Sequence, residues 1–294
     1  MNSLAVPFLR IFWRCVGSWR WWRSLATNST LAFGIVSGVV QLLLALWPNI
    51  EASRIVLFLS MVVSALAFGV VRAAPRREVS RSLGRPDVTV VVKVGDLFDE
   101  SSHLIIGFND TFDTDTSGDL VISRSSVQGQ FLARIYSGDT GCLDAELSDA
   151  LLGVEKKGRE ARSQKRAGKL TRYPVGSVAV LTRGARRYFC SAYGRMGNDL
   201  TVSSSVDDLW HSLANIWRAV EVFGRREPVA MPIIGSEMAR IDHADREILI
   251  RMILLSFVSR SRERLISKRL TIVVHPNDAN QLDMLEMDAF LKVL

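Results

Sequence analysis

The sequence predicts a transmembrane α-helical hairpin at the N-terminus, followed by an α/β domain with a mixed, mostly parallel sheet flanked by helices. Two observations lead to this prediction. Residues 31–47 and 55–71 are apolar segments without a charged side chain. From residue 88 onward, β-branched runs of strand length alternate with segments of helical periodicity, which is typical of a layered α/β domain.

Each apolar segment is long enough to cross a bilayer as a helix. A helix that rises ~1.5 Å per residue needs roughly 17–25 residues to span the hydrocarbon layer. We therefore predict two transmembrane helices within residues 30–71, at about 31–50 and 54–71, joined by a tight polar turn. Neither apolar segment contains an ionisable side chain, so nothing indicates a transport path. The apolar segments contain small residues that allow helices to approach closely, among them Gly34, Gly38 and Gly69. These residues are compatible with self-association of the helices but do not decide it.

The residues around the apolar segments carry the excess positive charge. The net charge is +7, and residues 1–87 alone hold ten arginines, no lysine and three acidic residues. Because arginines precede the first segment and follow the second, the positive-inside rule predicts that both termini are cytoplasmic. Residues 1–29, in which tryptophans alternate with arginines, are predicted to lie at the membrane interface, and residues 72–87 to form a linker.

The α/β domain that follows is electrically neutral. Residues 88–294 contain 27 basic and 27 acidic side chains, a balance that argues against binding of a nucleic-acid backbone. Residues 156–172 hold eight basic residues, but no aromatic residue interleaves them for base stacking, so we predict a solvated helix or a mobile loop. The cysteines and histidines lack the spacing of a disulfide framework or a metal site.

Pattern analysis predicts six strands and two helices in this domain. The strands are expected at 88–94, 104–108, 175–181, 188–193, 229–234 and 270–274. One helix is expected to face the core with Leu209, Leu213, Ile216, Trp217 and Val220. The other is expected to do so with Ile248, Met252, Leu255 and Val258.

Three predicted strands end in residues that suit a nucleotide. The sequences after these strands are Gly95-Asp96-Leu97, Asn109-Asp110 and Gly235 to Arg240. Ligands of open α/β sheets gather beyond the carboxyl ends of the strands. A glycine turn there exposes backbone N–H groups to a diphosphate, and an aspartate can accept a hydrogen bond from an exocyclic amine. Together these features predict a nucleotide pocket.

The same residues resemble the macro domains, which bind ADP-ribose. The similar segments are the strand Val90 to Leu97, the strand Leu104 to Asn109, the loop Ser126 to Phe131, the strand entry Tyr173 to Val178 and the loop Met231 to Arg240. More specifically, residues 88–294 are similar to the macro-domain effectors of Thoeris bacterial anti-phage defence. The markers are Phe108-Asn109-Asp110, Arg172 to Gly176, Pro232 to Gly235 with Ala239-Arg240-Ile241, and Ser256-Phe257-Val258.

This resemblance implies a function. A partner TIR-domain enzyme would make an ADP-ribose-derived signal of the histidine–ADP-ribose type, and the macro domain would bind it. The membrane segments, in a homo-oligomer in the bacterial inner membrane, would then assemble and disrupt the bilayer, with growth arrest or cell death. The resemblance implies no metal and no cofactor other than the ligand.

The resemblance also implies which residues bind the ligand. Asp96 would face adenine, Asn109 and Asp110 the distal ribose, and Gly129 with its neighbours the diphosphate. The expected ligand-binding set is Asp96, Leu97, Asn109, Asp110, Val127, Gln128, Gly129, Gly235, Ser236, Met238, Ala239 and Arg240.

Two departures from the hydrolytic macro domains favour a sensor without catalytic residues. Gln128 stands where those domains often carry an acidic residue, and Ser236 interrupts the glycine pattern of the second loop. Neither offers a general base to activate water. A membrane-tethered ADP-ribosyl hydrolase is the alternative, and a scaffold with a vestigial pocket is a third possibility.

Overall fold

The computed structural model describes residues 19–46, 53–73, 77–235 and 245–294. The chain divides into two compact units. The first comprises the residues up to Arg77 together with Asp283–Ala289, and the second comprises Glu78–Leu282 together with Phe290–Leu294.

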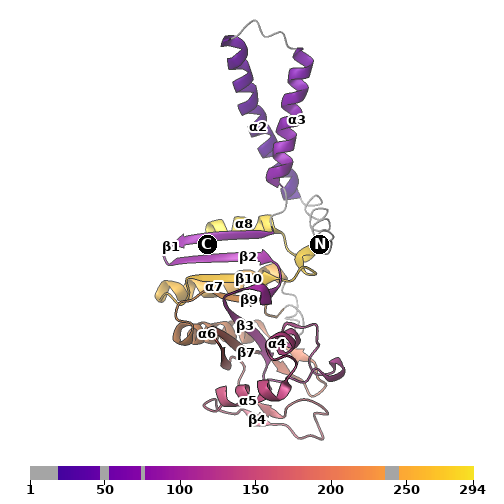
Figure 1. Ribbon diagram of the computed structural model, residues 1–294, viewed down its shortest axis with the longest axis vertical. Coiled ribbons are helices and arrows are strands. Elements are labelled where there is room, and N and C mark those ends of the chain that lie inside the picture. Colours follow the sequence, from indigo (N-terminus) through magenta and orange to yellow (C-terminus); the bar gives the residue numbers. More distant parts are fainter. Residues whose placement is uncertain (1–18, 47–52, 74–76, 236–244) are drawn as a thin grey trace. The chain divides into compact units, whose positions relative to one another are not determined.

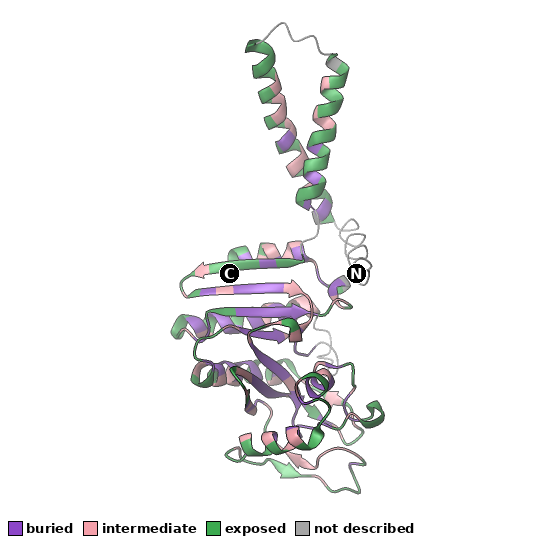
Figure 2. Ribbon diagram, viewed as in Figure 1, coloured by how far each residue is buried: buried purple, intermediate pink, exposed green. Residues whose placement is uncertain are grey.

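Two long helices dominate the first unit. They are α2 (Trp19–Leu46) and α3 (Arg54–Ala73), and both are long and apolar enough to cross a membrane. Only 6% and 11% of the residues in their apolar windows are buried, and Figure 2 shows both helices exposed along most of their length. This exposure distinguishes them from the core helix of a soluble protein, whose apolar face is covered by other chain segments.

The structure shows that the predicted interfacial segment and the first predicted span share one helix within the described residues. Residues 19–29 belong to the same continuous helix as the first apolar segment, because no glycine or proline interrupts the chain between them. The part of the predicted interfacial segment at 1–18 and the predicted turn at 47–52 lie outside the described residues.

A glycine allows α2 and α3 to pack closely. A Cβ atom at Gly69 would overlap the side chain of Ser29 and lie 3.1 Å from Leu25 Cδ1. Further along the hairpin, the rings of Phe33 and Phe58 meet edge to face with their centroids 6.3 Å apart. The two other small residues considered above, Gly34 and Gly38, have open space around them. Gly69 is therefore the glycine on which this helix contact depends.

We predict that Gly69→Ile separates the two helices. Forcing a branched side chain into a close-packed contact costs about 1–3 kcal/mol. The measurement is the yield of bismaleimide cross-linking between cysteines introduced by Phe33→Cys and Phe58→Cys, with the native cysteines replaced. Gly38→Ile, which meets open space, is the matched control and leaves the yield unchanged. An equal yield in both variants would contradict the assigned contact.

The second unit is built on an eight-stranded mixed sheet. Figure 1 shows strands of this sheet side by side from β1 to β7. The strand order is β1-β2-β10-β9-β3-β7-β6, and β8 pairs with β7. The pairs β2–β10, β10–β9, β9–β3 and β3–β7 are parallel, whereas β1–β2, β6–β7 and β7–β8 are antiparallel. The strands are β1 (Glu78–Gly84), β2 (Asp87–Val94), β3 (His103–Asn109), β6 (Val178–Arg183), β7 (Arg186–Met196), β8 (Val202–Ser203), β9 (Val229–Pro232) and β10 (Arg269–Val274).

Helices cover both faces of this sheet. The remaining elements are α4 (Val127–Ile135), α5 (Thr140–Ala150), α6 (Val206–Phe223), α7 (Arg246–Glu263), α8 (Met284–Val293), the hairpin of β4 (Gly158–Arg159) and β5 (Thr171–Arg172), and the 3₁₀ turns η1 (Leu97–Asp99), η2 (Ser117–Asp119) and η3 (Ala279–Gln281). On one face, Ile106 and Phe108 of β3 form a buried cluster with Phe131 of α4 and Leu143 of α5. Since side chains alternate along a strand, Ile105 points to the other face, where α6 and α7 pack together.

The fold class and all six predicted strands are confirmed, with small shifts at their ends. β6 begins at Val178 rather than at 175, because Gly176 adopts a φ of 90° in the turn before it. The helix stripe from Leu209 to Val220 is buried as expected, and Trp217 Nε1 donates a hydrogen bond of 2.9 Å to Ser256 Oγ of α7.

Four expectations are corrected. Residues 78–84 of the predicted linker form the edge strand β1, which pairs antiparallel with β2. The predicted face of α7 is partly wrong, because Ile248 and Leu255 are exposed whereas Leu249, Ile253 and Phe257 are buried; Val258 is buried as predicted. The glycine loop expected at 126–131 is the start of α4, with Ser126 as its N-cap. Residues 156–172 are not a helix but contain the β4–β5 hairpin.

Candidate ligand-binding site

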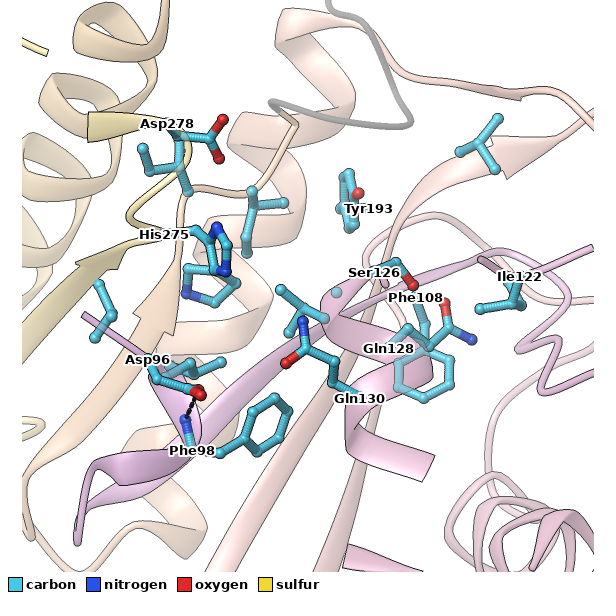
Figure 3. A pocket seen from close by; sticks show the side chains of 18 of the residues that line it. Asp96, Phe98, Phe108, Ile122, Ser126, Gln128, Gln130, Tyr193, His275 and Asp278 are labelled. Atoms are coloured by element: carbon cyan, nitrogen blue, oxygen red, sulfur yellow. Dashed lines mark hydrogen bonds between the residues drawn. The ribbon is translucent and has the colours of Figure 1, made fainter. Parts of the chain in front are cut away.

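A cleft opens at the carboxyl ends of β2, β10, β9 and β3, which are neighbours in the sheet. Its wall is completed by Tyr193 of β7 and by the first turn of α4 (Figure 3). All three predicted strands contribute, because parallel neighbouring strands finish at the same edge of the sheet. The third does so through Pro232, Ile233 and Ile234, and the expected Gly235 is not among the lining residues. The residues that line the cleft are Gly95, Asp96, Leu97, Phe98, Gly107, Phe108, Asn109, Ile122, Ser126, Val127, Gln128, Gln130, Tyr193, Val202, Pro232, Ile233, Ile234, Val273, His275 and Asp278.

Asp96 lies in the cleft directly after β2, and its carboxylate is held at both oxygens. Oδ1 accepts a hydrogen bond of 2.9 Å from the backbone N–H of Phe98, which makes Asp96 the N-cap of η1. Oδ2 lies 2.7 Å from Nη1 of Arg134 on α4. A carboxylate has about four acceptor positions, so about two remain for a ligand.

The first turn of α4 presents backbone N–H groups to the cleft. Ser126 Oγ accepts a hydrogen bond of 3.1 Å from the N–H of Gly129, which is the usual N-cap arrangement. Among the hydrogen bonds of the described residues, none uses the N–H of Val127 or Gln128, and both residues line the cleft. Free N–H groups at a helix N-terminus favour an anion.

Asn109 organises the turn that follows β3. Its Oδ1 accepts hydrogen bonds of 3.1 Å from the backbone N–H groups of Thr111 and Asp113, and one of 3.0 Å from Thr111 Oγ1. The side chain of Gln128, on the first turn of α4, donates a hydrogen bond to the backbone carbonyl of Asp113. This hydrogen bond therefore joins the turn after β3 to the first turn of α4.

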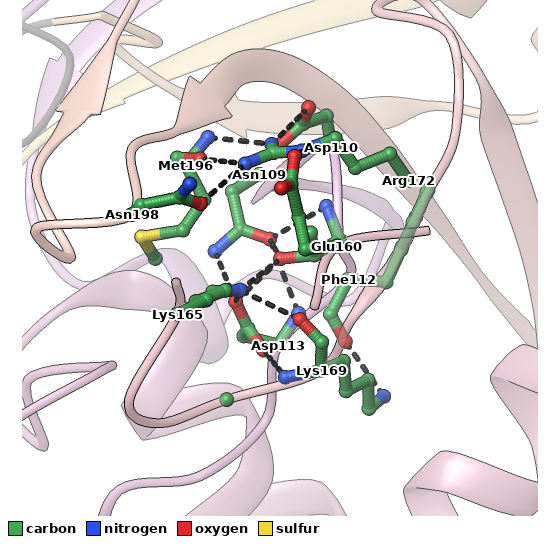
Figure 4. Close-up of polar contacts among 12 residues, drawn as sticks. Asn109, Asp110, Phe112, Asp113, Glu160, Lys165, Lys169, Arg172, Met196 and Asn198 are labelled. Atoms are coloured by element: carbon green, nitrogen blue, oxygen red, sulfur yellow. Dashed lines mark hydrogen bonds and ion pairs between the residues drawn. The ribbon is translucent and has the colours of Figure 1, made fainter. Parts of the chain in front are cut away.

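Asp110 is not among the lining residues of the cleft and instead forms an ion pair with Arg172. Its Oδ2 lies 2.7 Å from Arg172 Nη1, and its Oδ1 accepts a hydrogen bond of 2.8 Å from the backbone N–H of Met196 (Figure 4). Arg172 also binds Glu160, at 2.5 Å, and this hydrogen bond lowers the pKa of Glu160. Burial opposes the charge of Arg172, but its hydrogen bonds to Glu160 and Asp110 raise its pKa.

A fully buried ion pair holds the basic segment against the turn after β3. Lys165 Nζ lies 3.0 Å from Asp113 Oδ2, and neither side chain is exposed to solvent. Lys165 Nζ also donates to the backbone carbonyl of Lys169, at 2.7 Å, and Asp113 Oδ1 accepts from the Lys169 backbone N–H. Three of the eight basic residues at 156–172, namely Lys165, Lys169 and Arg172, are therefore bound to carboxylates rather than solvated.

The remaining expected residues differ in where the structure places them. Leu97 lines the cleft, but Gly129 does not, and a Cβ atom there would overlap the backbone of Ser123 and Arg124. Gly129 is thus required for the packing of α4. Gly235 has a φ of 90°, a conformation that favours glycine. Ser236, Met238, Ala239 and Arg240 lie outside the described residues.

Several lining residues were not predicted. His275 and Asp278 follow β10, and the strand-end rule applied to the other strands would have found them. Tyr193 lies on β7, and its ring packs so closely over Gly107 that a Cβ atom there would overlap it. Tyr193 carries no sequence signal, because its place in the cleft depends on the pairing of β7 with β3.

The described lining of the cleft contains no lysine or arginine. Its two carboxylates each have a cationic partner, Arg134 for Asp96 at 2.7 Å and Arg246 for Asp278 at 2.8 Å. In the described part of the site, an anionic ligand would therefore meet backbone N–H groups and neutral side chains rather than a cluster of cations.

We predict that Lys165→Met strongly destabilises the protein. Removing one partner of a buried ion pair leaves the other charge buried without compensation and costs about 3–5 kcal/mol. The measurement is the free energy of unfolding in denaturant, followed by circular dichroism in detergent micelles. Lys156→Met, on the same segment but exposed, is the control and is expected to change stability by about 0.5 kcal/mol or less. Equal stability of the two variants would show that the Lys165 pair is dispensable.

Comparisons with known proteins give the following matches. The profile of a family described as "Thoeris protein ThsA, Macro domain" matches residues 90–275. No curated protein matches the chain. Among solved structures, a mutant of the Oceanobacillus iheyensis macrodomain is 15% identical, with a TM-score of 0.47, covering 74% of this chain and 100% of that one. The same macrodomain with ADP gives the same values, and a mutant with ADPR is 16% identical, with a TM-score of 0.44, covering 73% and 99%.

Proposed function

This chain belongs to the Thoeris ThsA macro-domain family, and on that premise we propose that its cleft binds an ADP-ribose-type ligand as the signal of a membrane-anchored defence effector. The observation that carries the proposal is the convergence of Asp96, the α4 N-terminus and the ends of β9 and β10 on one cleft.

The chemistry of the cleft supports this ligand class. The Asp96 carboxylate retains acceptor positions for the exocyclic amine of adenine. The N–H groups of Val127 and Gln128 suit a diphosphate, because the positive end of a helix dipole favours anions. The rings of Phe98, Tyr193 and His275 line the cleft and offer faces for a base or a ribose.

We propose that the cleft senses its ligand rather than hydrolysing it. Of the described lining residues, Asp96 and Asp278 are the carboxylates, and each is held in an ion pair. A general base needs free access to the proton that it removes. Gln128, which replaces the acidic residue of many hydrolytic relatives, is bound to the backbone carbonyl of Asp113.

The wider proposal concerns signal and output. A partner TIR-domain enzyme makes the ADP-ribose derivative, of the histidine–ADP-ribose type, and its binding favours assembly of a homo-oligomer in the bacterial inner membrane. The hairpin of α2 and α3 then disrupts the bilayer, with both termini on the cytoplasmic side. This output requires that the ligand bind the assembled state more tightly than the unassembled one. The two long apolar helices support the membrane part of this proposal.

We predict that Asp96→Ala weakens binding of ADP-ribose roughly 10- to 150-fold, because a hydrogen bond to a charged group contributes about 1.5–3 kcal/mol. The measurement is isothermal calorimetry on the protein in detergent micelles. Asp99→Ala, on the same 3₁₀ turn but exposed and outside the cleft lining, is the matched control and leaves the affinity unchanged.

Two results would contradict the proposal. Absence of heat with wild-type protein at millimolar ADP-ribose and ADP-ribose conjugates would exclude the ligand class. Multiple-turnover release of ADP-ribose from a modified peptide would establish the hydrolase alternative in place of the sensor.

We also predict that deleting residues 1–77 preserves ligand binding but removes toxicity in cells that make the signal. The cleft is formed entirely by residues of the second compact unit, whereas the apolar helices belong to the first. The paired measurements are calorimetry on the truncated protein and growth after induction. Continued killing by a truncated protein that fractionates as soluble would overturn the membrane mechanism.

A further inference from the structure

We propose that Arg134 is a positioning residue that makes the cleft select an amino base over a keto base. This inference rests on the proposed function. It concerns the ion pair between Arg134 Nη1 and Asp96 Oδ2, at 2.7 Å, which joins the last turn of α4 to the strand end after β2.

The contacts of Arg134 fix the orientation of the Asp96 carboxylate. The guanidinium holds Oδ2, while the backbone N–H of Phe98 holds Oδ1 at 2.9 Å. The guanidinium carbon also lies 5.2 Å from the centre of the Phe98 ring, within the range of a cation–π contact. Three groups, two of which line the cleft, therefore restrict one another.

The exposure of this ion pair indicates that its main role is not to stabilise the fold. The side chain of Arg134 is 45% exposed and that of Asp96 31%, and ion pairs at this level of exposure contribute little to stability. A carboxylate that rotates freely would lose conformational entropy when it accepts a hydrogen bond from a ligand. Arg134 restricts this rotation before binding, which improves affinity without touching the ligand.

A fixed carboxylate also rejects the wrong base. An exocyclic amine, as in adenine, can donate to Asp96, whereas a keto oxygen at the same position places a second acceptor against the carboxylate. A free carboxylate can turn away from this repulsion, but one held at both oxygens cannot. Selection by unfavourable contacts is a general source of specificity.

Arg134 shares its helix with the N–H groups proposed to hold the diphosphate. α4 begins at Val127 with these amides and carries Arg134 one residue before its end. A rigid helix thus sets the distance between the diphosphate position and the oriented carboxylate. A base attached to a bound diphosphate is therefore presented to Asp96 in a fixed place.

The test is calorimetry with ADP-ribose and with its hypoxanthine analogue, inosine diphosphate ribose, on the full-length protein in micelles. We expect wild-type protein to prefer ADP-ribose by about tenfold or more. Arg134→Gln is expected to reduce this preference to about threefold or less, and Arg134→Lys to restore it in part, since lysine keeps the charge without the planar fork.

A matched ion pair outside the cleft provides the control. Arg195 binds Asp208 at 2.7 Å with its side chain 54% exposed, so Arg195→Gln is expected to leave the preference unchanged. Circular dichroism melting of each variant checks that the fold is intact.

Three results would overturn the inference alone. They are equal binding of the two ligands by wild-type protein, an unchanged preference in Arg134→Gln, and an equal loss of affinity for both ligands in that variant. In each case ADP-ribose binding by the wild-type protein would still support the proposed function. Failure of the wild-type protein to bind either ligand would remove the proposed function and this inference together.

Discussion

The candidate site depends on one constraint of the sheet, which is that four neighbouring parallel strands end at the same edge. β2, β10, β9 and β3 are adjacent, so residues far apart in the chain, such as Asp96 and His275, meet at one cleft. Parallel pairing requires crossover connections, and these bring the helices that cover the sheet. The first turn of α4 reaches the cleft in this way, because α4 lies within the connection that follows β3.

The turn after β3 takes the partners of its two carboxylates from the basic segment. Asn109, Asp110, Thr111 and Asp113 are all buried, and buried polar groups need partners because the protein interior solvates them poorly. Asn109 satisfies the backbone of the turn, but the two carboxylates need cations. Lys165 and Arg172 supply them from a segment more than 50 residues away. The basic segment thus neutralises an acidic turn, which agrees with the neutral charge of the domain as a whole.

Local patterns were sufficient to predict most of the fold. The apolar spans and the β-branched strands are continuous in sequence, and α6 has a single apolar face. β1 was not predicted because it is an edge strand. Only Val79 is buried in it, and its exposed positions are polar. The face of α7 was predicted incorrectly in part because apolar residues surround most of that helix, so periodicity alone cannot choose between Leu249 and Ile248.

The sequence predicted where the site lies more accurately than it predicted the contacts within it. Asp96, Leu97, Asn109, Val127 and Gln128 line the cleft as expected. Asp110 was assigned to the ribose from the resemblance to macro domains, but its partner Arg172 lies 62 residues along the chain, and nothing local reveals that pair. His275 was missed although it obeys the same rule as Asp96, since it ends the neighbouring strand.

The distribution of charge helps to explain how the two units can work in one protein. Arginines concentrate beside the apolar helices, where cations interact with anionic lipid headgroups. The described lining of the cleft has none. A cleft lined with cations would attract many polyanions at long range, including headgroups and nucleic acid. Backbone N–H groups act only at short range and in a fixed geometry, so they hold a diphosphate only when the rest of the ligand also fits. For the sensor that we propose, that difference would separate the signal from other phosphate compounds.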